Sequence, residues 1–199
     1  ISAQYAYALN APLITIDQQS KYLCGDFPTT LAGFTYQDEV ERLRLFFPKA
    51  DARLICSFFK VPLRSMNQEM FFFPPTIKER VITMKRRAKK NELLVYISSA
   101  RTFHQTIKEI VRICSTQQET TFHVFLGEGG GSVPKKMAKP NIHVYKHGDA
   151  AFDTIMAECS GIITTAGHTL LSEAMYLGIP VYAIPVAPYE QQMNAKIIH

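Results

Sequence analysis

The sequence predicts an α/β protein, because short apolar runs of strand length alternate with segments whose apolar residues recur at helical spacing. The strand-like runs are apolar almost throughout, which is typical of parallel strands buried on both faces. The composition of the 199 residues, 47% hydrophobic and 20% charged, excludes a disordered, collagen-like or coiled-coil chain. No apolar stretch reaches the roughly 18 residues that cross a bilayer, and the opening residues lack a basic leader, so we expect no membrane span and no signal peptide there. The four scattered cysteines described below predict a cytoplasmic protein.

The first part of the chain contains two clear strands and one helix. Residues 13–17 are a short β-branched run and residues 54–59 an apolar run, and we expect each to be a strand. Residues 37–47 carry apolar side chains at helical spacing, and Pro48 ends this helix. Three phenylalanines followed by two prolines at residues 71–75 predict a stiff extended connector, and we expect a domain boundary there.

Beyond residue 92 the alternation becomes regular. Strands are expected at residues 93–98, 122–126, 142–145, 161–164 and 179–184. Helices are expected at residues 103–114, 152–159 and 168–177, with Gly178 just past the last one. This order predicts a parallel sheet covered on both faces. Because the second half has five strands and the first only two, we infer a piece of a longer protein, cut inside one domain and soon after the last strand of the next.

The net charge of +5 is a local feature of the sequence. Of the 22 basic residues, five occupy six consecutive positions, and the remaining 17 balance the 17 acidic ones; the five are Lys85, Arg86, Arg87, Lys89 and Lys90. A general polyanion binder would spread its charge more widely, so we predict no nucleic-acid partner. We interpret the run as a solvated helix end before a strand, with contact to an anionic membrane surface as the alternative.

Two features that suggest a bound cofactor have a simpler interpretation. The four cysteines lie far apart without a Cys/His cluster, which predicts reduced, buried thiols and no zinc site; they are Cys24, Cys56, Cys114 and Cys159. The glycine-rich residues 127–132 follow a strand, but Pro134 and Pro140 leave no room for the helix that a dinucleotide-binding fingerprint requires. We therefore expect a loop beside a ligand cleft, and no cofactor.

The most specific segment joins the strand at residues 161–164 to the helix at residues 168–177. Small residues at Thr165, Ala166 and Gly167 let a ligand approach the backbone, and the N–H groups at a helix start favour a phosphate. The carboxylate of Glu173, about one turn further on, can accept hydrogen bonds from a pair of ribose hydroxyls. Each residue also has an interpretation without a ligand: Gly167 as a turn glycine and Glu173 as a carboxylate on the helix surface.

The loop after the next strand adds polar side chains at the same carboxyl edge of the sheet, where ligands bind in such folds. Glu190, Gln191 and Asn194 can hydrogen-bond sugar hydroxyls there, although the same residues could simply begin a helix. Each position taken alone is ambiguous, whereas their combination at fixed spacing on successive strands is much more specific.

These residues resemble the donor-site signature of the GT-B glycosyltransferases. The resemblance rests on residues 167–174 (GHTLLSEA), residues 178–180 (GIP), Pro185, Glu190 with Gln191, and Asn194 with Ala195. It is strong over residues 93–195, where the chain is similar to the lipid II-forming N-acetylglucosaminyltransferases and the UDP-glycosyltransferases. It is weaker over the first 75 residues, where residues 11–19 resemble an acceptor-domain strand and its polar loop.

The resemblance implies two Rossmann-like domains with parallel sheets facing across a cleft, the N-terminal one incomplete. Residues 1–75 would be the C-terminal part of the acceptor-side domain, residues 76–92 a linker with the basic segment, and residues 93–199 the domain that binds the nucleotide-sugar donor. The family's last strand and C-terminal crossover helix, and its early catalytic base, are expected to lie outside this chain, so the catalytic residues are unknown.

The resemblance also implies a role for each matching residue. The diphosphate would be held by Gly167, His168 and Thr169, with Ser98 and Ser99 facing it. Glu173 would bind the ribose, and the transferred sugar would be read by Glu190, Gln191 and Gln192. Tyr145 and Lys146 would border the base. No metal is expected, because the helix start neutralises the leaving diphosphate.

Two residues keep two interpretations. His168 stands where several relatives carry a small residue, and it is either a phosphate donor or a structural histidine. Asp17 is the candidate on the acceptor side, or else an aspartate that caps its own loop.

The function expected is transfer of a sugar from a nucleoside diphosphate sugar, UDP-linked, to a cell-envelope or lipid-linked glycan, at the inner membrane face if the basic run contacts lipid. A nucleotide-sugar 2-epimerase of the same fold and a non-catalytic nucleotide-sugar binding module remain as alternatives.

Overall fold

The computed structural model describes residues 2–46, 49–64, 69–98, 111–126, 139–146, 148–185 and 189–199. The chain forms two compact units, one made of Ile1–Thr76 with Pro185–His199 and the other of Ile77–Ile184. These units do not coincide with the ranges predicted by function, because residues 77–92 pack in the second unit and residues 185–199 in the first. The donor and acceptor roles given to those ranges stay a prediction.

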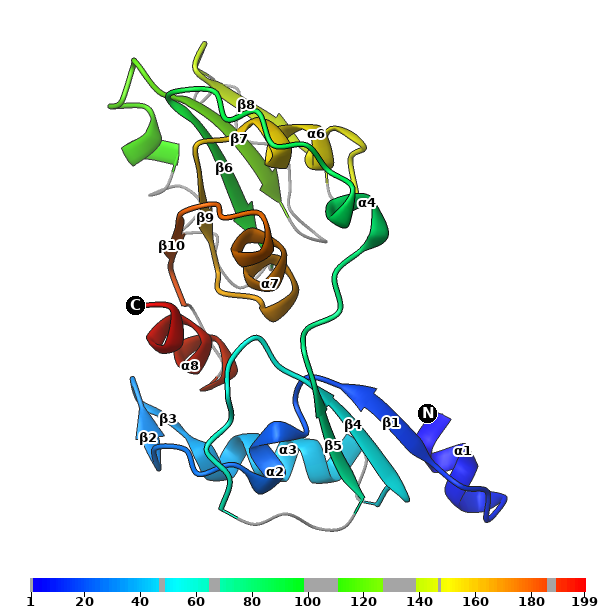
Figure 1. Ribbon diagram of the computed structural model, residues 1–199. Helices are drawn as coiled ribbons and strands as arrows, with labels where there is room; N and C mark the ends of the chain where they lie inside the picture. The colour runs from blue at the N-terminus through cyan, green and yellow to red at the C-terminus, as the bar shows by residue number, and fades with distance from the viewer. Residues whose placement is uncertain are drawn as a thin grey trace. The chain divides into compact units, whose positions relative to one another are not determined.

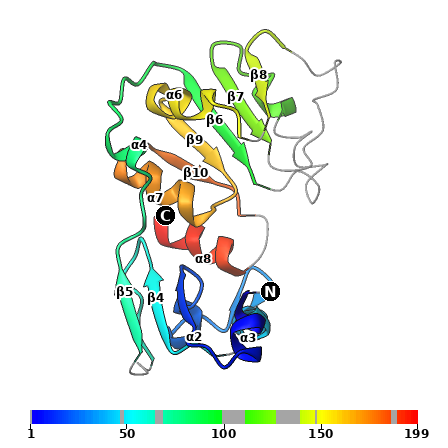
Figure 2. The same ribbon diagram turned by 90° about the vertical axis from the view of Figure 1, so that its right-hand side faces the viewer.

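The second unit is built on a five-stranded parallel sheet (Figure 1). Across the sheet the strands are β10 (Val181–Ala183), β9 (Gly161–Thr164), β6 (Glu92–Ile97), β7 (Thr121–Leu126) and β8 (Ile142–Tyr145). All four pairings are parallel, which confirms the sheet type that the apolar runs predicted. The chain runs from β6 outward through β7 to β8, then returns to β9 on the other side of β6 and continues outward to β10 (Figure 2).

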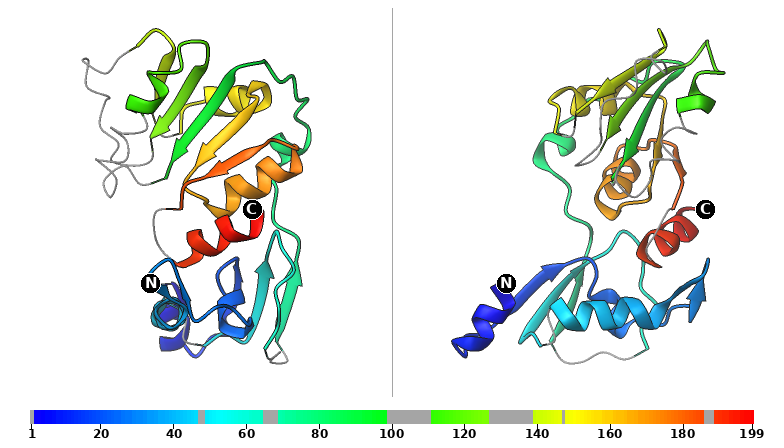
Figure 3. Two further views of the ribbon diagram at one scale, coloured as in Figure 1. Left: turned by 90° about the vertical axis from the view of Figure 1, so that its left-hand side faces the viewer. Right: turned by 180° about the vertical axis from the view of Figure 1, so that it is seen from behind.

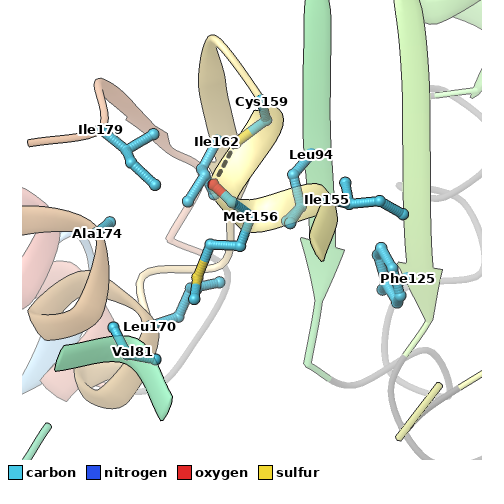
Figure 4. Close-up of a cluster of buried hydrophobic side chains, with 10 residues drawn as sticks. All are labelled: Val81, Leu94, Phe125, Ile155, Met156, Cys159, Ile162, Leu170, Ala174 and Ile179. Atoms are coloured by element: carbon cyan, nitrogen blue, oxygen red, sulfur yellow. Dashed lines mark hydrogen bonds between the residues drawn. The ribbon is translucent and has the colours of Figure 1, made fainter. Parts of the chain in front are cut away.

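One face of this sheet is covered by α6 (Ala151–Glu158) and α7 (His168–Tyr176). Leu94, Ile162 and Phe125 project from three neighbouring strands into a cluster with side chains of both helices (Figure 4). The short helix α4 (Glu79–Ile82) adds Val81 to the same cluster, which explains why residues 77–92 belong to this unit. Val111 and Cys114, in the described end of the helix expected at residues 103–114, are also buried; residues 103–110 lie outside the described part of the chain.

The basic run does not end a helix, so this prediction was wrong. Residues 85–89 follow α4 as an irregular segment along the end of α6, with backbone bonds from Arg87 N to Ala157 O and from Lys89 N to Glu158 O. Arg86 Nη2 donates to Cys159 O at 3.0 Å, and Lys89 Nζ pairs with Glu158 Oε2 at 2.5 Å. These carbonyls and this carboxylate hold the segment in place without helical hydrogen bonds.

The first unit contains a three-stranded parallel sheet (Figure 3). Its order is β1 (Ile14–Asp17), β4 (Ala52–Cys56) and β5 (Met70–Phe73). The other elements are α1 (Ser2–Ala8), α2 (Lys21–Cys24), the hairpin of β2 (Thr30–Leu31) and β3 (Phe34–Thr35), α3 (Tyr36–Phe46) and α8 (Tyr189–Ile198). The helix expected at residues 37–47 is confirmed as α3, and the two strands expected first are confirmed as β1 and β4.

The connector predicted at residues 71–75 is in part a strand. Phe71, Phe72 and Phe73 belong to β5 and lie beside Leu54, Ile55 and Cys56 of β4, so the extended connector begins only at Pro74. The prolines indicated the end of the element, but not that the aromatic run before them pairs with a neighbouring strand.

The two faces of this small sheet differ in exposure. Ile55 is fully buried, and Phe72 packs against the cluster around Tyr22, Leu43 and Tyr189. On the opposite face, Ile14, Ile16, Phe71 and Phe73 are between 47% and 70% exposed. The buried cluster of the first unit is rich in aromatic side chains, with Tyr22 from α2, Tyr189 from α8 and Phe27 from the segment after α2. Among the described residues, no helix is long and apolar enough to span a membrane.

Candidate functional site

The sheet of the second unit has a topological switch point between β6 and β9, because the chain leaves these neighbouring strands toward opposite edges. Ligands of open α/β sheets bind in the crevice beyond the carboxyl ends of two such strands. Ser98, directly after β6, and Thr165, directly after β9, meet there with their hydroxyl oxygens 2.8 Å apart. Ser98 N also donates to Thr165 Oγ1 at 3.4 Å. The predicted partner Ser99 lies outside the described residues.

Helix α7 begins directly after this switch point. Its first hydrogen bond runs from Leu171 N to Gly167 O at 3.1 Å, so the N–H groups of Thr169 and Leu170 have no acceptor within the helix. In the described part of the chain no side chain caps this end. A helix start of this kind carries about half a positive elementary charge and favours an anion.

The backbone before α7 leaves room beside Gly167. The fully buried Ala166 has a φ of 61°, a left-handed conformation that costs a non-glycine residue about 1 kcal/mol or more. Among the described residues, a methyl group built onto Gly167 would meet no atom within 4 Å beyond its chain neighbours. Thr169 is exposed and His168 is 7% exposed, so of these two side chains only Thr169 offers its atoms freely to solvent.

Glu173 lies further along α7 and is 1% exposed. Its Oε1 atom is 3.1 Å from the ammonium of Lys78, which precedes α4 and keeps a side chain 47% exposed. A buried carboxylate is costly unless it is paired, and this ion pair supplies the compensating charge. The sequence did not indicate Lys78, because 95 positions separate it from Glu173 and only the packing of α4 brings the two together.

Tyr145 and Lys146, predicted to border a base, end strand β8 and follow it. The Tyr145 ring stacks on Phe125, with centroids 4.6 Å apart. Its hydroxyl is 3.0 Å from His123 Nδ1, and His123 Nε2 is 2.5 Å from Glu92 Oε2. This polar chain crosses three neighbouring strands and fixes the Tyr145 side chain, whose pKa is raised by burial.

The predicted sugar-reading residues lie in the first unit, on α8. Glu190 is 8% exposed, and its two carboxylate oxygens accept from Gln18 Nε2 at 2.9 Å and from Gln19 Nε2 at 3.0 Å. Gln191 is half-buried, and Gln192 Nε2 donates to Pro185 O at 3.2 Å. The loop after β1 therefore supplies the partners of Glu190, although 172 positions separate Gln18 from it.

Asp17 caps the loop that contains these two glutamines. Its Oδ1 accepts from the backbone N–H groups of Gln19 at 2.9 Å and Ser20 at 2.6 Å, and its Oδ2 accepts from Ser20 Oγ at 2.8 Å. This is the loop-capping arrangement that the sequence left open. The role of Asp17 toward an acceptor stays a prediction.

The structure is that of an α/β protein, and its parallel sheets match those of GT-B glycosyltransferases. The model of the family described as glycosyl transferase family 1 matches residues 1–199, so the chain belongs to this family. No curated protein sequence is significantly similar to the chain.

Solved structures with the same fold share little sequence with this chain. UGT2 of Phytolacca americana, solved with UDP-2-fluoro-glucose and pterostilbene, is 15% identical with a TM-score of 0.62, covering 98% of this chain and 56% of its own. The glycotransferase of kitacinnamycin is 15% identical with a TM-score of 0.58, and the match covers 83% of this chain and 43% of that protein. The spinosyn rhamnosyltransferase SpnG is 14% identical with a TM-score of 0.57, covering 98% and 53%. The chain thus spans about half the length of these proteins.

Proposed function

We propose that this chain is part of an enzyme that transfers a sugar from a nucleoside diphosphate sugar, UDP-linked, to a glycan or lipid-linked acceptor without a metal ion. The observation that carries the proposal is the start of α7 at the switch point of the parallel sheet. Its N–H groups, the space beside Gly167 and the hydroxyls of Ser98 and Thr165 together suit a diphosphate.

The chemistry required of the protein is stabilisation of a leaving group. An acceptor oxygen forms a bond to the anomeric carbon while the bond to the diphosphate oxygen breaks, and the leaving diphosphate gains negative charge. Fixed dipoles at a helix start stabilise that charge without reorganisation during the reaction. Family membership supports this reaction class, and the proposed assignment gives residues 93–199 the donor-binding role and residues 1–75 the acceptor side.

The remaining contacts of the donor follow from the same proposal. Glu173 would accept the ribose hydroxyls while Lys78 balances its charge, and Tyr145 with Lys146 would border the base. Glu190 and Gln191, with Gln192, would read the sugar. On the acceptor side the proposed candidate is Asp17, at the end of β1.

Titration calorimetry of the full-length protein with UDP, GDP and UDP-N-acetylglucosamine tests the proposal. Replacing Glu173 by Ala or Gln removes a charge-assisted hydrogen-bonding partner. The binding of one of the nucleotides should then weaken by about 1.5–3 kcal/mol, which is roughly ten- to hundredfold in affinity. Glu119→Ala, at an exposed carboxylate of the same unit, should change nothing. Equal affinities for all variants in a folded protein would contradict the proposed ribose contact.

Product analysis separates the reaction classes. A transferase releases free UDP and a glycosylated acceptor. An epimerised sugar nucleotide without free UDP would instead indicate a nucleotide-sugar 2-epimerase. Tight binding without turnover in the full-length protein would indicate a binding module.

For the basic run we propose peripheral contact with anionic lipid through Lys85, Arg86, Arg87, Lys89 and Lys90. Because Arg86 and Lys89 also bind Cys159 O and Glu158, the test uses the exposed Lys85, Arg87 and Lys90. Each basic side chain near an anionic surface contributes about 1 kcal/mol. Sedimentation with phosphatidylglycerol vesicles should therefore fall sharply when the three are changed to Gln. Equal sedimentation would contradict membrane contact.

A further inference from the structure

Lys21 is a lysine with no exposed surface, at the start of α2 in the first unit. Its ammonium donates to the backbone oxygen of Gln18 at 2.6 Å and to the side-chain oxygen Oε1 of Gln18 at 3.1 Å. It also lies 5.1 Å from the ring centroid of Tyr22 and 5.5 Å from that of Phe59. Burying an ammonium group is costly, and these partners are what makes the position tolerable.

The contact with Lys21 decides which way the Gln18 amide points. An ammonium group only donates hydrogen bonds, so the Gln18 atom facing it must be the acceptor Oε1. The amide nitrogen Nε2 is then directed to the other side, where it donates to Glu190 Oε1 at 2.9 Å. If the Gln18 amide were flipped, its oxygen would face the Glu190 carboxylate and repel it.

The Glu190 carboxylate is thereby held at both oxygens, by Gln18 on one and Gln19 on the other. An ionised carboxylate oxygen can accept about two hydrogen bonds, so each oxygen keeps capacity for one more. A pair of sugar hydroxyls requires such a fixed, bidentate acceptor. A carboxylate free to rotate would lose orientational order on binding, which weakens the contact.

We propose that Lys21 is the positioning residue of the sugar-reading carboxylate: through Gln18 it holds Glu190 in the single orientation that accepts two hydroxyls of the transferred sugar. The inference rests on the proposed sugar-reading role of Glu190. Lys21 itself touches no sugar.

The titratable groups around Lys21 come from four elements, namely the carboxyl groups of Glu190 on α8, Asp17 at the end of β1 and Glu39 on α3, and the thiol of Cys56 on β4. Burial lowers the Lys21 pKa to about 8, against the opposing effect of these groups. Once Lys21 loses its proton, the amine no longer makes a charge-assisted hydrogen bond to Gln18 Oε1, so Gln18 and the Glu190 carboxylate bound to it are held less firmly. Recognition of the sugar should therefore weaken as the pH rises above 8, while recognition of the nucleotide does not.

Calorimetry of the full-length protein with UDP, UDP-glucose and UDP-N-acetylglucosamine tests this inference. The quantity compared is the ratio of sugar-nucleotide affinity to UDP affinity. Glu190→Gln and Lys21→Met should each lower this ratio about tenfold, the effect of one charge-assisted hydrogen bond. The double variant should lose no more than either single one, because both act through one contact. Lys21→Arg, which keeps a positive charge, should lower the ratio less than Lys21→Met does. Lys60→Met, at an exposed lysine of the same unit, should leave the ratio unchanged.

The outcomes separate the inference from the function it rests on. If Glu190→Gln lowers the ratio but a folded Lys21→Met does not, the positioning role is overturned and the sugar-reading role stands. If Glu190→Gln has no effect, both are overturned. If Lys21→Met does not fold, Gln18→Leu and the pH series of the unaltered protein take its place: a ratio independent of pH between 7 and 10 and of Gln18 would overturn the positioning role.

Discussion

Replacing Gly167 by alanine should leave the protein as stable as before and yet weaken its binding of a nucleoside diphosphate. Gly167 has φ −67° and ψ 135°, a conformation that any L-residue adopts without strain. Among the described residues, the added methyl group would meet no atom within 4 Å beyond its chain neighbours. The free energy of unfolding should therefore change little, because the gain of about 0.4–1 kcal/mol from restricting the unfolded chain is offset by the loss of glycine, which is preferred to alanine at a helix N-cap.

The loss of affinity follows from where the methyl group would lie. It would occupy the open space beside the start of α7, and a diphosphate displaced from that space gives up hydrogen bonds to the N–H groups of Thr169 and Leu170. Each charge-assisted bond contributes about 1.5–3 kcal/mol, so losing one should weaken UDP binding about ten- to hundredfold.

The matched control is Gly178→Ala, just beyond the end of the same helix. Gly178 has a φ of 64°, where alanine is strained and should cost about 1 kcal/mol or more. This variant should lose stability in urea unfolding while keeping its UDP affinity in calorimetry, the opposite of Gly167→Ala. If Gly167→Ala binds UDP as tightly as the unaltered protein, the diphosphate does not lie beside Gly167 and the proposed donor site is wrong.

Three further predictions concern stability and reactivity. Burial lowers the pKa of Lys21 in the folded chain to about 8, from an ordinary lysine pKa of 10.5, so between these two pH values the unfolded chain holds more protons than the folded one. Relative to Lys21→Met, urea stability should therefore rise by about 3 kcal/mol from pH 8 to 10.5, and parallel pH curves would refute this. Asp17→Ala removes three accepted hydrogen bonds and should lower the free energy of unfolding by about 1.5–3 kcal/mol; an unchanged value would contradict the capping role. The four free cysteines are buried, with the pKa of Cys114 raised to about 11 by burial, so a disulfide reagent should label them only after unfolding; fast labelling of the folded chain would show that a thiol is accessible.

The amino-acid sequence alone was sufficient for the parallel sheet of the second unit and for the start of α7. Strand β9 is buried at three of its four positions and reads as a short apolar run, so it could be delimited to the residue. The edge strand β8 was delimited equally well, although His143 and Val144 are exposed. The helix start at His168 was visible because Gly167 interrupts the apolar run and helical spacing follows at once. Both patterns depend only on residues close together in the sequence, so they can be recognised without knowing which distant segments pack against them.

Predictions failed where an element has no pattern of its own. Residues 71–73 are a strand because β4 offers them hydrogen-bonding partners, and nothing within these three aromatic residues requires it. The basic run is irregular because carbonyls and Glu158 at the end of α6 hold it, whereas its composition alone favoured a helix end. In both cases a contact with a distant segment outweighed the local preference.

The residues that carry chemistry were recognisable from their spacing, but their partners were not. The sequence singled out Glu173 and Glu190 as acceptors of ligand hydroxyls. Only the tertiary structure placed Lys78 beside Glu173, and Gln18 and Gln19 on the oxygens of Glu190. The physical reason is that a buried charge requires compensation from whatever side chain the packing brings within about 3 Å, and sequence separation carries no information about that side chain.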